Sequence, residues 1–153
     1  MRKAIFWSAR PEHVATVFSA DVIERIRKSV ELPDQVYSPD DLGKVDFSDV
    51  EFIFSTWGAR SLSSEEWKTY FPKLTHFFYA AGATDTFARP LLEIGVHISS
   101  SWRANAIPVA EYTVSVILLG LKNFFQLVRT GHSPENWTTR PRDPGIRSPH
   151  LSG

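Results

Sequence analysis

The sequence predicts an α/β fold: a doubly wound parallel sheet of about five strands, followed by a long connector helix and an extended tail. Short apolar runs typical of buried strands alternate with segments whose apolar residues recur at helical spacing. The connections between them are short, which favours right-handed crossovers and a parallel sheet covered on both faces. The 153 residues are enough for one core-forming domain and too few for two full ones.

The first third of the chain supplies two strands and the helix between them. The apolar run 4–7 predicts a buried strand, and Pro11 suits the first turn of a helix because proline lacks the N–H that would be unpaired there. Apolar residues then recur at helical spacing as far as Val30. A second strand is expected over 35–37, and the capping and acidic residues of 38–41 favour a helix start.

The middle of the chain supplies three more strands, expected over 51–57, 75–81 and 96–99. A capping box at 63–66 predicts a helix that Pro72 ends. Asp85 is expected to cap the next helix, which runs to Ile94 and ends at Gly95.

A long apolar helix is expected to open at Pro108 with Glu111 in its first turn, after a loop that carries Arg103 and Asn105. Its middle turns have little polar face, so it should be buried on more than one side, against a partner or as a core helix between two layers. From Ser133 onward, repeated prolines predict an extended segment.

Composition narrows the possible functions. The chain has 17 basic residues (Lys and Arg) and 17 acidic residues (Asp and Glu), so it has no net charge that would favour binding to nucleic acid or to an anionic membrane. Without cysteine there is no disulfide framework or thiolate nucleophile, and the five histidines have no metal-ligand spacing. The longest apolar run, 114–121, is shorter than the ~20 residues that span a bilayer. We therefore expect a cytoplasmic protein with no nucleic-acid, membrane or metal partner.

Small residues and tryptophans follow the ends of the predicted strands, where open parallel sheets bind ligands. Gly82 would let the backbone approach a ligand closely, and the amides around it could hold a carboxylate. Alternatively, Gly82 only makes a tight turn, and Trp57 and Trp102 only cover the core.

Asn105 is a second candidate. Its amide offers a donor and an acceptor, so it could contact both the carboxylate and the carbonyl of a 2-oxo acid. It could instead cap or brace the helix near Pro108. Arg103 could clamp a carboxylate, but a solvated side chain is the expectation for it.

Three motifs resemble those of the D-isomer-specific 2-hydroxyacid dehydrogenases. Residues 105–111 read Asn-Ala-Ile-Pro-Val-Ala-Glu, similar to the family's Asn-x-x-x-Val-Ala-Glu junction between its substrate and nucleotide domains. Residues 78–82 fall in its glycine loop, although the second glycine is absent here, and 92–99 resemble its return strand. The match covers roughly 51–125.

The resemblance implies a flavodoxin-like substrate-binding domain over 1–103, a connector helix over 104–130, and a linker over 131–153 that leads to a Rossmann domain. It implies hydride transfer between NAD or NADP and a small 2-hydroxy or 2-oxo acid. The backbone amides of Ala81, Gly82 and Ala83 would then hold the substrate carboxylate. Asn105 would orient the substrate, and Trp57 and Trp102 would be pocket walls.

The family's catalytic Arg, Glu and His belong to its nucleotide-binding part or lie just beyond it, and the chain has no Gly-x-Gly-x-x-Gly loop. We therefore expect no dehydrogenase activity from this chain alone, a missing nucleotide-binding domain as its partner, and a homo-oligomer. The alternative is a stand-alone, non-catalytic module that binds small carboxylates or dimerises. A phospho-receiver domain would need acidic residues at the ends of the first and third strands, where this chain has Trp7-Ser8 and Thr56-Trp57.

Overall fold

The computed structural model describes residues 1–130, and contacts divide the chain into two compact units, Met1–Ile107 and a second unit from Pro108. The first unit contains one parallel sheet of six strands: β1 (Arg2–Trp7), β2 (Val30–Glu31), β3 (Val36–Tyr37), β4 (Val50–Ser55), β5 (His76–Tyr79) and β6 (His97–Ser100). The sheet order is β2-β1-β4-β5-β6, with β3 also paired to β1. This is the flavodoxin-like doubly wound order, which confirms the expected fold class.

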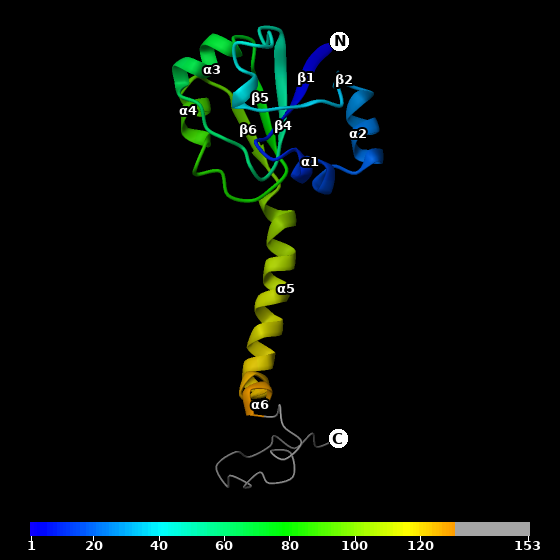
Figure 1. Cartoon of the computed structure of the whole chain (residues 1–153), viewed down its shortest axis with the longest axis vertical. Coiled ribbons are helices and arrows are strands. Elements are labelled where there is room, and N and C mark those ends of the chain that lie inside the picture. The colour runs from blue at the N-terminus through cyan, green and yellow to red at the C-terminus, as the bar shows by residue number, and fades with distance from the viewer. Residues whose placement is uncertain (131–153) are drawn as a thin grey trace. The chain divides into compact units, whose positions relative to one another are not determined.

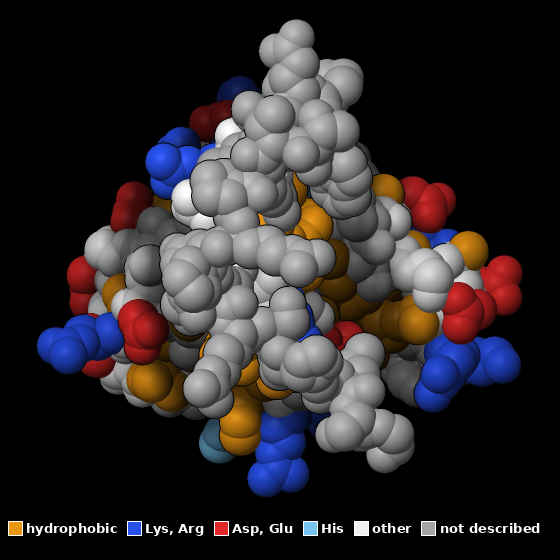
Figure 2. All heavy atoms as spheres, turned by 90° about the horizontal axis from the view of Figure 1, so that it is seen from below, with side chains coloured by type: hydrophobic (Ala, Val, Ile, Leu, Met, Phe, Trp, Pro, Cys, Tyr) orange, Lys and Arg blue, Asp and Glu red, His pale blue; other side chains and the backbone are white. Residues whose placement is uncertain are grey.

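Helices cover both faces of the sheet (Figure 1). Helices α1 (Pro11–Val17) and α2 (Ala20–Arg27) pack on one face, and α3 (Ser64–Tyr70) and α4 (Ala88–Glu93) on the other. A short 3-10 helix, η1 (Pro39–Asp41), follows β3. Charged side chains of both signs alternate around the outline of the space-filling view, in keeping with the balanced composition (Figure 2).

The single helix expected from Pro11 to Val30 is wrong, because the chain breaks it at Phe18 and Ser19, which are both extended. Phe18 is buried and meets the ring of Phe6 edge-on at 5.2 Å. Packing of that ring therefore interrupts the helical pattern, and Val30 falls in the short strand β2, which the sequence did not reveal.

Asp85 does not cap α4 as expected, since the N-cap residue is Phe87 and residues 85–87 form a turn. Phe87 is 2% exposed and packs on the ring of Tyr79 at 4.8 Å. The turn thus places the Phe87 ring in the core, and α4 starts at the next residue. Gly95 ends the segment with a φ of +82°, a conformation that favours glycine.

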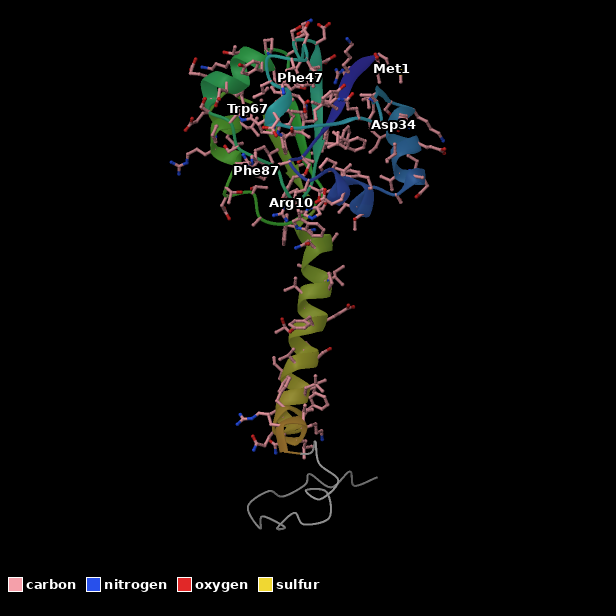
Figure 3. The ribbon with its side chains drawn as sticks, in the orientation of Figure 1. Met1, Arg10, Asp34, Phe47, Trp67 and Phe87 are labelled. Carbon is pink, nitrogen blue, oxygen red and sulfur yellow. The ribbon has the colours of Figure 1, made fainter. Side chains whose placement is uncertain are left out.

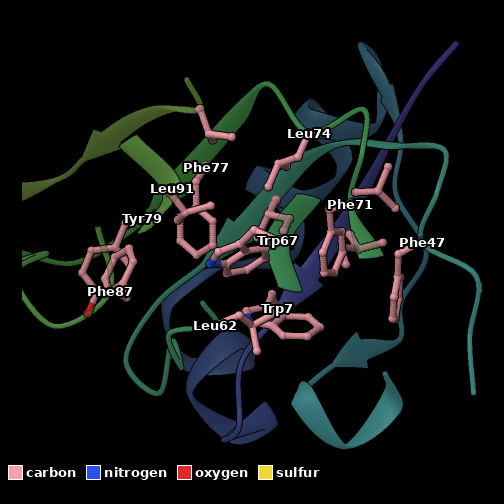
Figure 4. Close-up of a cluster of buried hydrophobic side chains, with 14 of the residues drawn as sticks. Trp7, Phe47, Leu62, Trp67, Phe71, Leu74, Phe77, Tyr79, Phe87 and Leu91 are labelled. Atoms are coloured by element: carbon pink, nitrogen blue, oxygen red, sulfur yellow. The ribbon is translucent and has the colours of Figure 1, made fainter. Parts of the chain in front are cut away.

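The main core lies between the sheet and helices α3 and α4 (Figure 4). Trp7 and Trp67 are both fully buried with ring centroids 5.9 Å apart, and Phe47 stacks on Phe71 at 5.0 Å. Trp7 is the last residue of β1 and Trp67 belongs to α3. The core therefore extends to the carboxyl edge of the sheet and fixes the strand ends there.

The second unit begins inside helix α5 (Trp102–Leu121), and α6 (Phe124–Thr130) follows after Asn123, whose φ is +57°. The expected helix start at Pro108 is wrong. Arg103 and Asn105 are helical, and Pro108 lies inside the helix, where it cannot donate the hydrogen bond to the carbonyl of Ala104. The expected linker over 131–153 lies outside the described residues.

Helix α5 has 20 residues, and an 18-residue stretch within it has a mean hydropathy of 1.5, so by length and composition alone it could cross a membrane. The uninterrupted apolar run 114–121 is shorter than this helix, because α5 begins at Trp102, earlier than expected. Many of the large apolar side chains from Pro108 onward are exposed, among them Ile117, Leu118 and Leu121.

Candidate functional site

The candidate site lies at the carboxyl edge of the sheet. All strands are parallel, so β1, β4, β5 and β6 end at the same edge, at Trp7, Ser55, Tyr79 and Ser100. The order of the strands reverses between β1 and β4. Ligands of open α/β sheets bind beyond the carboxyl ends of the strands at such a reversal.

The loop after β5 presents three successive backbone donors. The amide of Ala80 still donates to the Ser55 carbonyl at 2.8 Å, as a continuation of the sheet. Within the described residues, the amides of Ala81, Gly82 and Ala83 have no protein acceptor. A buried unpaired N–H is costly, and Ala81 is only 2% exposed. These donors can therefore accommodate the oxygens of a bound anion.

The side chain of Asn105 lies over this loop. A Cβ placed on Gly82 would be 2.9 Å from the Asn105 Nδ2 atom. The structure thus brings together two of the residues selected from the sequence. Asn105 is half-buried, and its amide group makes no hydrogen bond within residues 1–130.

The position of Asn105 also bears on its alternative role as a helix cap. It is the fourth residue of α5, and its backbone N–H donates to the Ser101 carbonyl at 2.9 Å. A residue inside the first turn is not the N-cap, whose side chain would accept from the N–H groups that follow. The amide is therefore available for a ligand.

The two tryptophans make separate contacts. Trp57 is 47% exposed and meets the His13 ring edge-on, with 6.0 Å between centroids. Trp102 is exposed at the start of α5, where the Arg103 guanidinium lies 5.3 Å from its ring centroid. Arg103 is exposed, as expected, although it stacks on an indole.

Ser8, for which the sequence predicts no role, joins the loop after β1 to the loop after β4. Its Oγ atom lies 3.0 Å from the Trp57 carbonyl and 3.1 Å from the Arg10 carbonyl, and accepts a hydrogen bond from the Arg10 N–H at 3.0 Å. Ser8 is completely buried. No motif reveals it, because Trp57, whose carbonyl joins Ser8 to the second loop, lies 49 positions away in the sequence.

No carboxylate or other charged side chain belongs to the run 79–84 that forms the Gly82 loop. Burial raises the pKa of the Tyr79 phenol at the end of β5 above its ordinary value of 10.0. Within the described residues, no group of three or more His, Asp and Glu could hold a metal ion. The chemistry of the Gly82 loop is therefore that of hydrogen-bond donors.

Comparison with known proteins finds similarity in the fold. No protein-family model matches the chain, and no curated protein matches it by sequence. Among solved structures, a phosphoglycerate oxidoreductase from Rhizobium etli matches with a TM-score of 0.58 at 16% identity, over 84% of this chain and 40% of its own. The structure of D-2-hydroxyisocaproate dehydrogenase gives 0.57 at 14%, over 92% and 42%.

A third neighbour is the NADPH-dependent glyoxylate/hydroxypyruvate reductase from Sinorhizobium meliloti in complex with NADP and malonate. Its TM-score is 0.56 at 17% identity, over 90% of this chain and 40% of that one. The structural neighbours are thus D-isomer 2-hydroxyacid dehydrogenases, and the similarity establishes a shared fold. The described chain spans about 40% of their length.

Proposed function

We propose that this chain is the substrate-binding portion of an NAD(P)-dependent oxidoreductase that interconverts a 2-hydroxy and a 2-oxo acid. The observation that carries the proposal is the set of unpaired amides at Ala81, Gly82 and Ala83 beneath the free amide of Asn105. Support also comes from the solved neighbours, which include a D-lactate dehydrogenase from Aquifex aeolicus complexed with NAD and lactic acid (TM-score 0.54).

The proposed roles follow from the donors present. The three N–H groups hold the substrate carboxylate, as oriented amides in a turn hold anions. Asn105 donates from Nδ2 to a carboxylate oxygen or to the 2-oxo oxygen, and so fixes the rotation of the substrate about its C1–C2 bond. Trp57 and Trp102 are proposed as walls that limit the size of the acid.

The residues of this chain do not fit a dinucleotide. Gly58, Gly82 and Gly95 are isolated, and no Gly-x-Gly-x-x-Gly segment follows a strand. NAD or NADP would therefore be held by residues of a longer protein, together with the groups that transfer protons. Accordingly, the 153-residue chain is proposed to bind the acid without reducing it, and steady oxidation of NADH with glyoxylate by the pure chain would refute this.

Asn105→Ala tests the proposed site. We expect the affinity for oxamate, a non-reacting analogue of a 2-oxo acid, to fall about tenfold, as loss of one hydrogen bond to a charged group implies. The melting temperature should stay unchanged, because the side chain has no partner in the described protein. Arg103→Gln is the control and should bind oxamate like the wild type. A lower melting temperature with normal affinity would instead assign Asn105 a structural role.

The remaining expectations are part of the same proposal. We propose a cytoplasmic protein that assembles as a homo-oligomer and associates with a nucleotide-binding domain. The alternative is a stand-alone module that binds carboxylates or dimerises, in which the exposed apolar surface from Pro108 onward would form the dimer interface. The intact mass of the natural product separates the two, since a mass near 17.3 kDa would support the module.

A further inference from the structure

A basic hollow lies at the carboxyl edge of the sheet, at the point where the strand order reverses. It has a volume of about 380 Å³ and is formed by the turn after β1 and the loop after β4. Its lining comprises two alanines and Arg10, His13, Trp57, Gly58 and Arg60. Arg10 lies at the lower edge of the sheet domain, where β1 ends (Figure 3). The lining contains two arginines and no carboxylate.

The hollow is built by a network of short contacts. The Ala9 N–H donates to the Gly58 carbonyl at 3.0 Å, and the buried Ser8 hydroxyl ties the same two loops together. Gly58 has a φ of +92°, and a Cβ there would lie 2.8 Å from Ser8 Oγ and 3.3 Å from Arg10 Cβ. The stem of Arg10 therefore packs directly on the Gly58 backbone. The fold therefore sets where the Arg10 side chain leaves the backbone, and its guanidinium group is exposed.

The positive charge of the hollow is not neutralised. In the described part of the chain, Arg2, Arg27 and Lys73 form ion pairs with carboxylates, whereas Arg10 and Arg60 form none. Glu12 follows Arg10 closely in the sequence, but it neither lines the hollow nor pairs with an arginine.

His13 adds a third polar group to the lining. Its Nδ1 lies 3.2 Å from the Trp57 carbonyl, an acceptor, so Nδ1 donates to that oxygen and the ring is held at the wall of the hollow.

The register places this hollow at the same edge of the sheet as the Gly82 loop. Ser55 pairs with Trp7 on one side and with Tyr79 on the other. Trp7, Ser55 and Tyr79 thus form one row across the sheet. Arg10, Gly58 and Gly82 each follow a residue of this row by three positions. Adjacent strands are about 4.8 Å apart, so the loop after β4 starts one strand away from the Gly82 loop and the loop after β1 starts two strands away, all at the same edge of the sheet.

We propose that Arg10 and Arg60 bind a second anionic group of the substrate, a carboxylate or a phosphate. This inference rests on the proposed function, and it specifies the substrate as a 2-hydroxy or 2-oxo acid with an anionic group at its far end. Each guanidinium can donate two parallel hydrogen bonds to such a group. A substrate with one carboxylate leaves both arginines without an anion.

The test compares three 2-hydroxy acids by titration calorimetry on the full chain: D-lactate with one carboxylate, D-malate with two, and D-3-phosphoglycerate with a carboxylate and a phosphate. We expect at least one of the two doubly anionic acids to bind about tenfold more tightly than D-lactate, and the better one identifies the second group. The double variant R10Q/R60Q should lose this preference and keep its affinity for D-lactate.

Charge-matched and folding controls make the result specific. The variant R25Q/K28Q removes two positive charges at α2 and should retain the preference, and both double variants should melt like the wild type because all four side chains are exposed or partly exposed. Equal affinities of the wild type for all three acids would overturn the inference. Survival of the preference in R10Q/R60Q, or its loss in R25Q/K28Q, would also overturn it.

Two further measurements separate this inference from the proposed function. If D-lactate binding depends on Asn105 but no preference exists, the hollow is not a subsite and the proposed function stands. If Asn105→Ala changes nothing while inorganic phosphate binds in an Arg10- and Arg60-dependent way, the hollow binds anions and the proposed function fails.

Discussion

Gly82 and Asn105 act as a pair because the absence of one side chain makes room for the other. Nothing in the backbone conformation demands glycine at position 82, since its φ is not in the left-handed region. What demands it is the Asn105 amide, 2.9 Å from the place where a Cβ would be. Glycine is therefore required at position 82 by the neighbouring Asn105 side chain and not by the backbone conformation of the turn.

Gly82→Ala should weaken ligand binding without unfolding the protein. The new methyl group would displace the end of a flexible side chain, which costs little stability, but it would move the amide from its position over the loop. We expect a loss of about tenfold in oxamate affinity, similar to that of Asn105→Ala, and a nearly unchanged melting temperature. Gly120→Ala, whose Cβ would meet nothing within 4 Å, is the matched control for binding.

A second prediction about single residues concerns the stability contributed by the buried Trp67. The indole N–H groups of Trp7 and Trp67 are buried without a hydrogen-bond partner among the described residues. An unpaired buried donor costs about 1–3 kcal/mol, whereas a smaller ring loses packing. We expect Trp67→Phe to destabilise less than Phe71→Leu, which shortens a buried neighbour without removing a polar group. Urea unfolding of both variants measures the difference, and a larger loss for Trp67→Phe would show that packing dominates.

The sequence was most informative about individual residues that carry a motif. Gly82 and Asn105 could be selected because a family pattern marks both, and the structure brings them together. Arg10 and Arg60 could not be selected in this way. They meet at one hollow only because β1 and β4 are neighbours in the sheet, and no local pattern encodes that adjacency.

At the scale of the element, local chemistry predicted helix α3 better than it predicted α1, α2 and α4. The Ser63 Oγ accepts from the Glu66 N–H at 3.2 Å, and the Glu66 carboxylate accepts from the Ser63 N–H at 2.8 Å. This reciprocal box is determined by four consecutive residues. The boundaries of α1 and α4 depend instead on Phe18 and Phe87, whose burial is decided by distant strands.

Removing this cap should destabilise the sheet domain measurably. Ser63→Ala leaves the Glu66 N–H without its acceptor, and we expect a loss of about 1 kcal/mol in the free energy of unfolding. Ser61→Ala, outside the helix and outside the box, is the control and should cost less. Equal losses in the two variants would mean that the box contributes nothing.

The same box makes stability depend on pH. Hydrogen bonds from the Ser63 hydroxyl and backbone lower the pKa of Glu66 below its ordinary value of 4.5. Because the folded pKa is the lower one, this contribution is complete above pH 4.5 and is lost as the pH falls through the folded value. The free-energy difference between wild type and Glu66→Gln should therefore be largest near neutral pH and shrink in acid, as unfolding at several pH values would reveal. A difference that grows in acid would contradict it.

At the scale of the whole molecule, the two units differ in how well they bury apolar surface. The first unit has a core on both faces of its sheet, with rings such as Trp7, Phe6 and Phe77 almost fully buried. From Pro108 onward the described helices expose most of their large apolar residues. Contiguous exposed apolar surface of this kind marks an interaction site.

The position of Glu111 in α5 indicates whether the exposed apolar surface from Pro108 onward contacts lipid or protein. Glu111 is the tenth of its 20 residues, so a membrane-spanning α5 would place a carboxylate near the bilayer centre. A charge there costs about 2.5–3.5 kcal/mol or more. A protein partner covers the apolar residues and leaves Glu111 in water, and we therefore favour protein contact over a bilayer.

The 153-residue chain alone should then self-associate through α5 and α6. Ile117, Leu118 and Leu121 are each more than half exposed, and their burial between copies would release about 25 cal/mol per Å² of apolar surface. Light scattering should give a mass above that of the monomer, and Ile117→Lys with Leu118→Glu, which leaves the net charge unchanged, should reduce it to 17.3 kDa. Neutral phosphatidylcholine vesicles should not deplete the wild type from solution. A monomeric wild type would contradict self-association, and depletion by vesicles would show that the bilayer covers α5 in spite of Glu111.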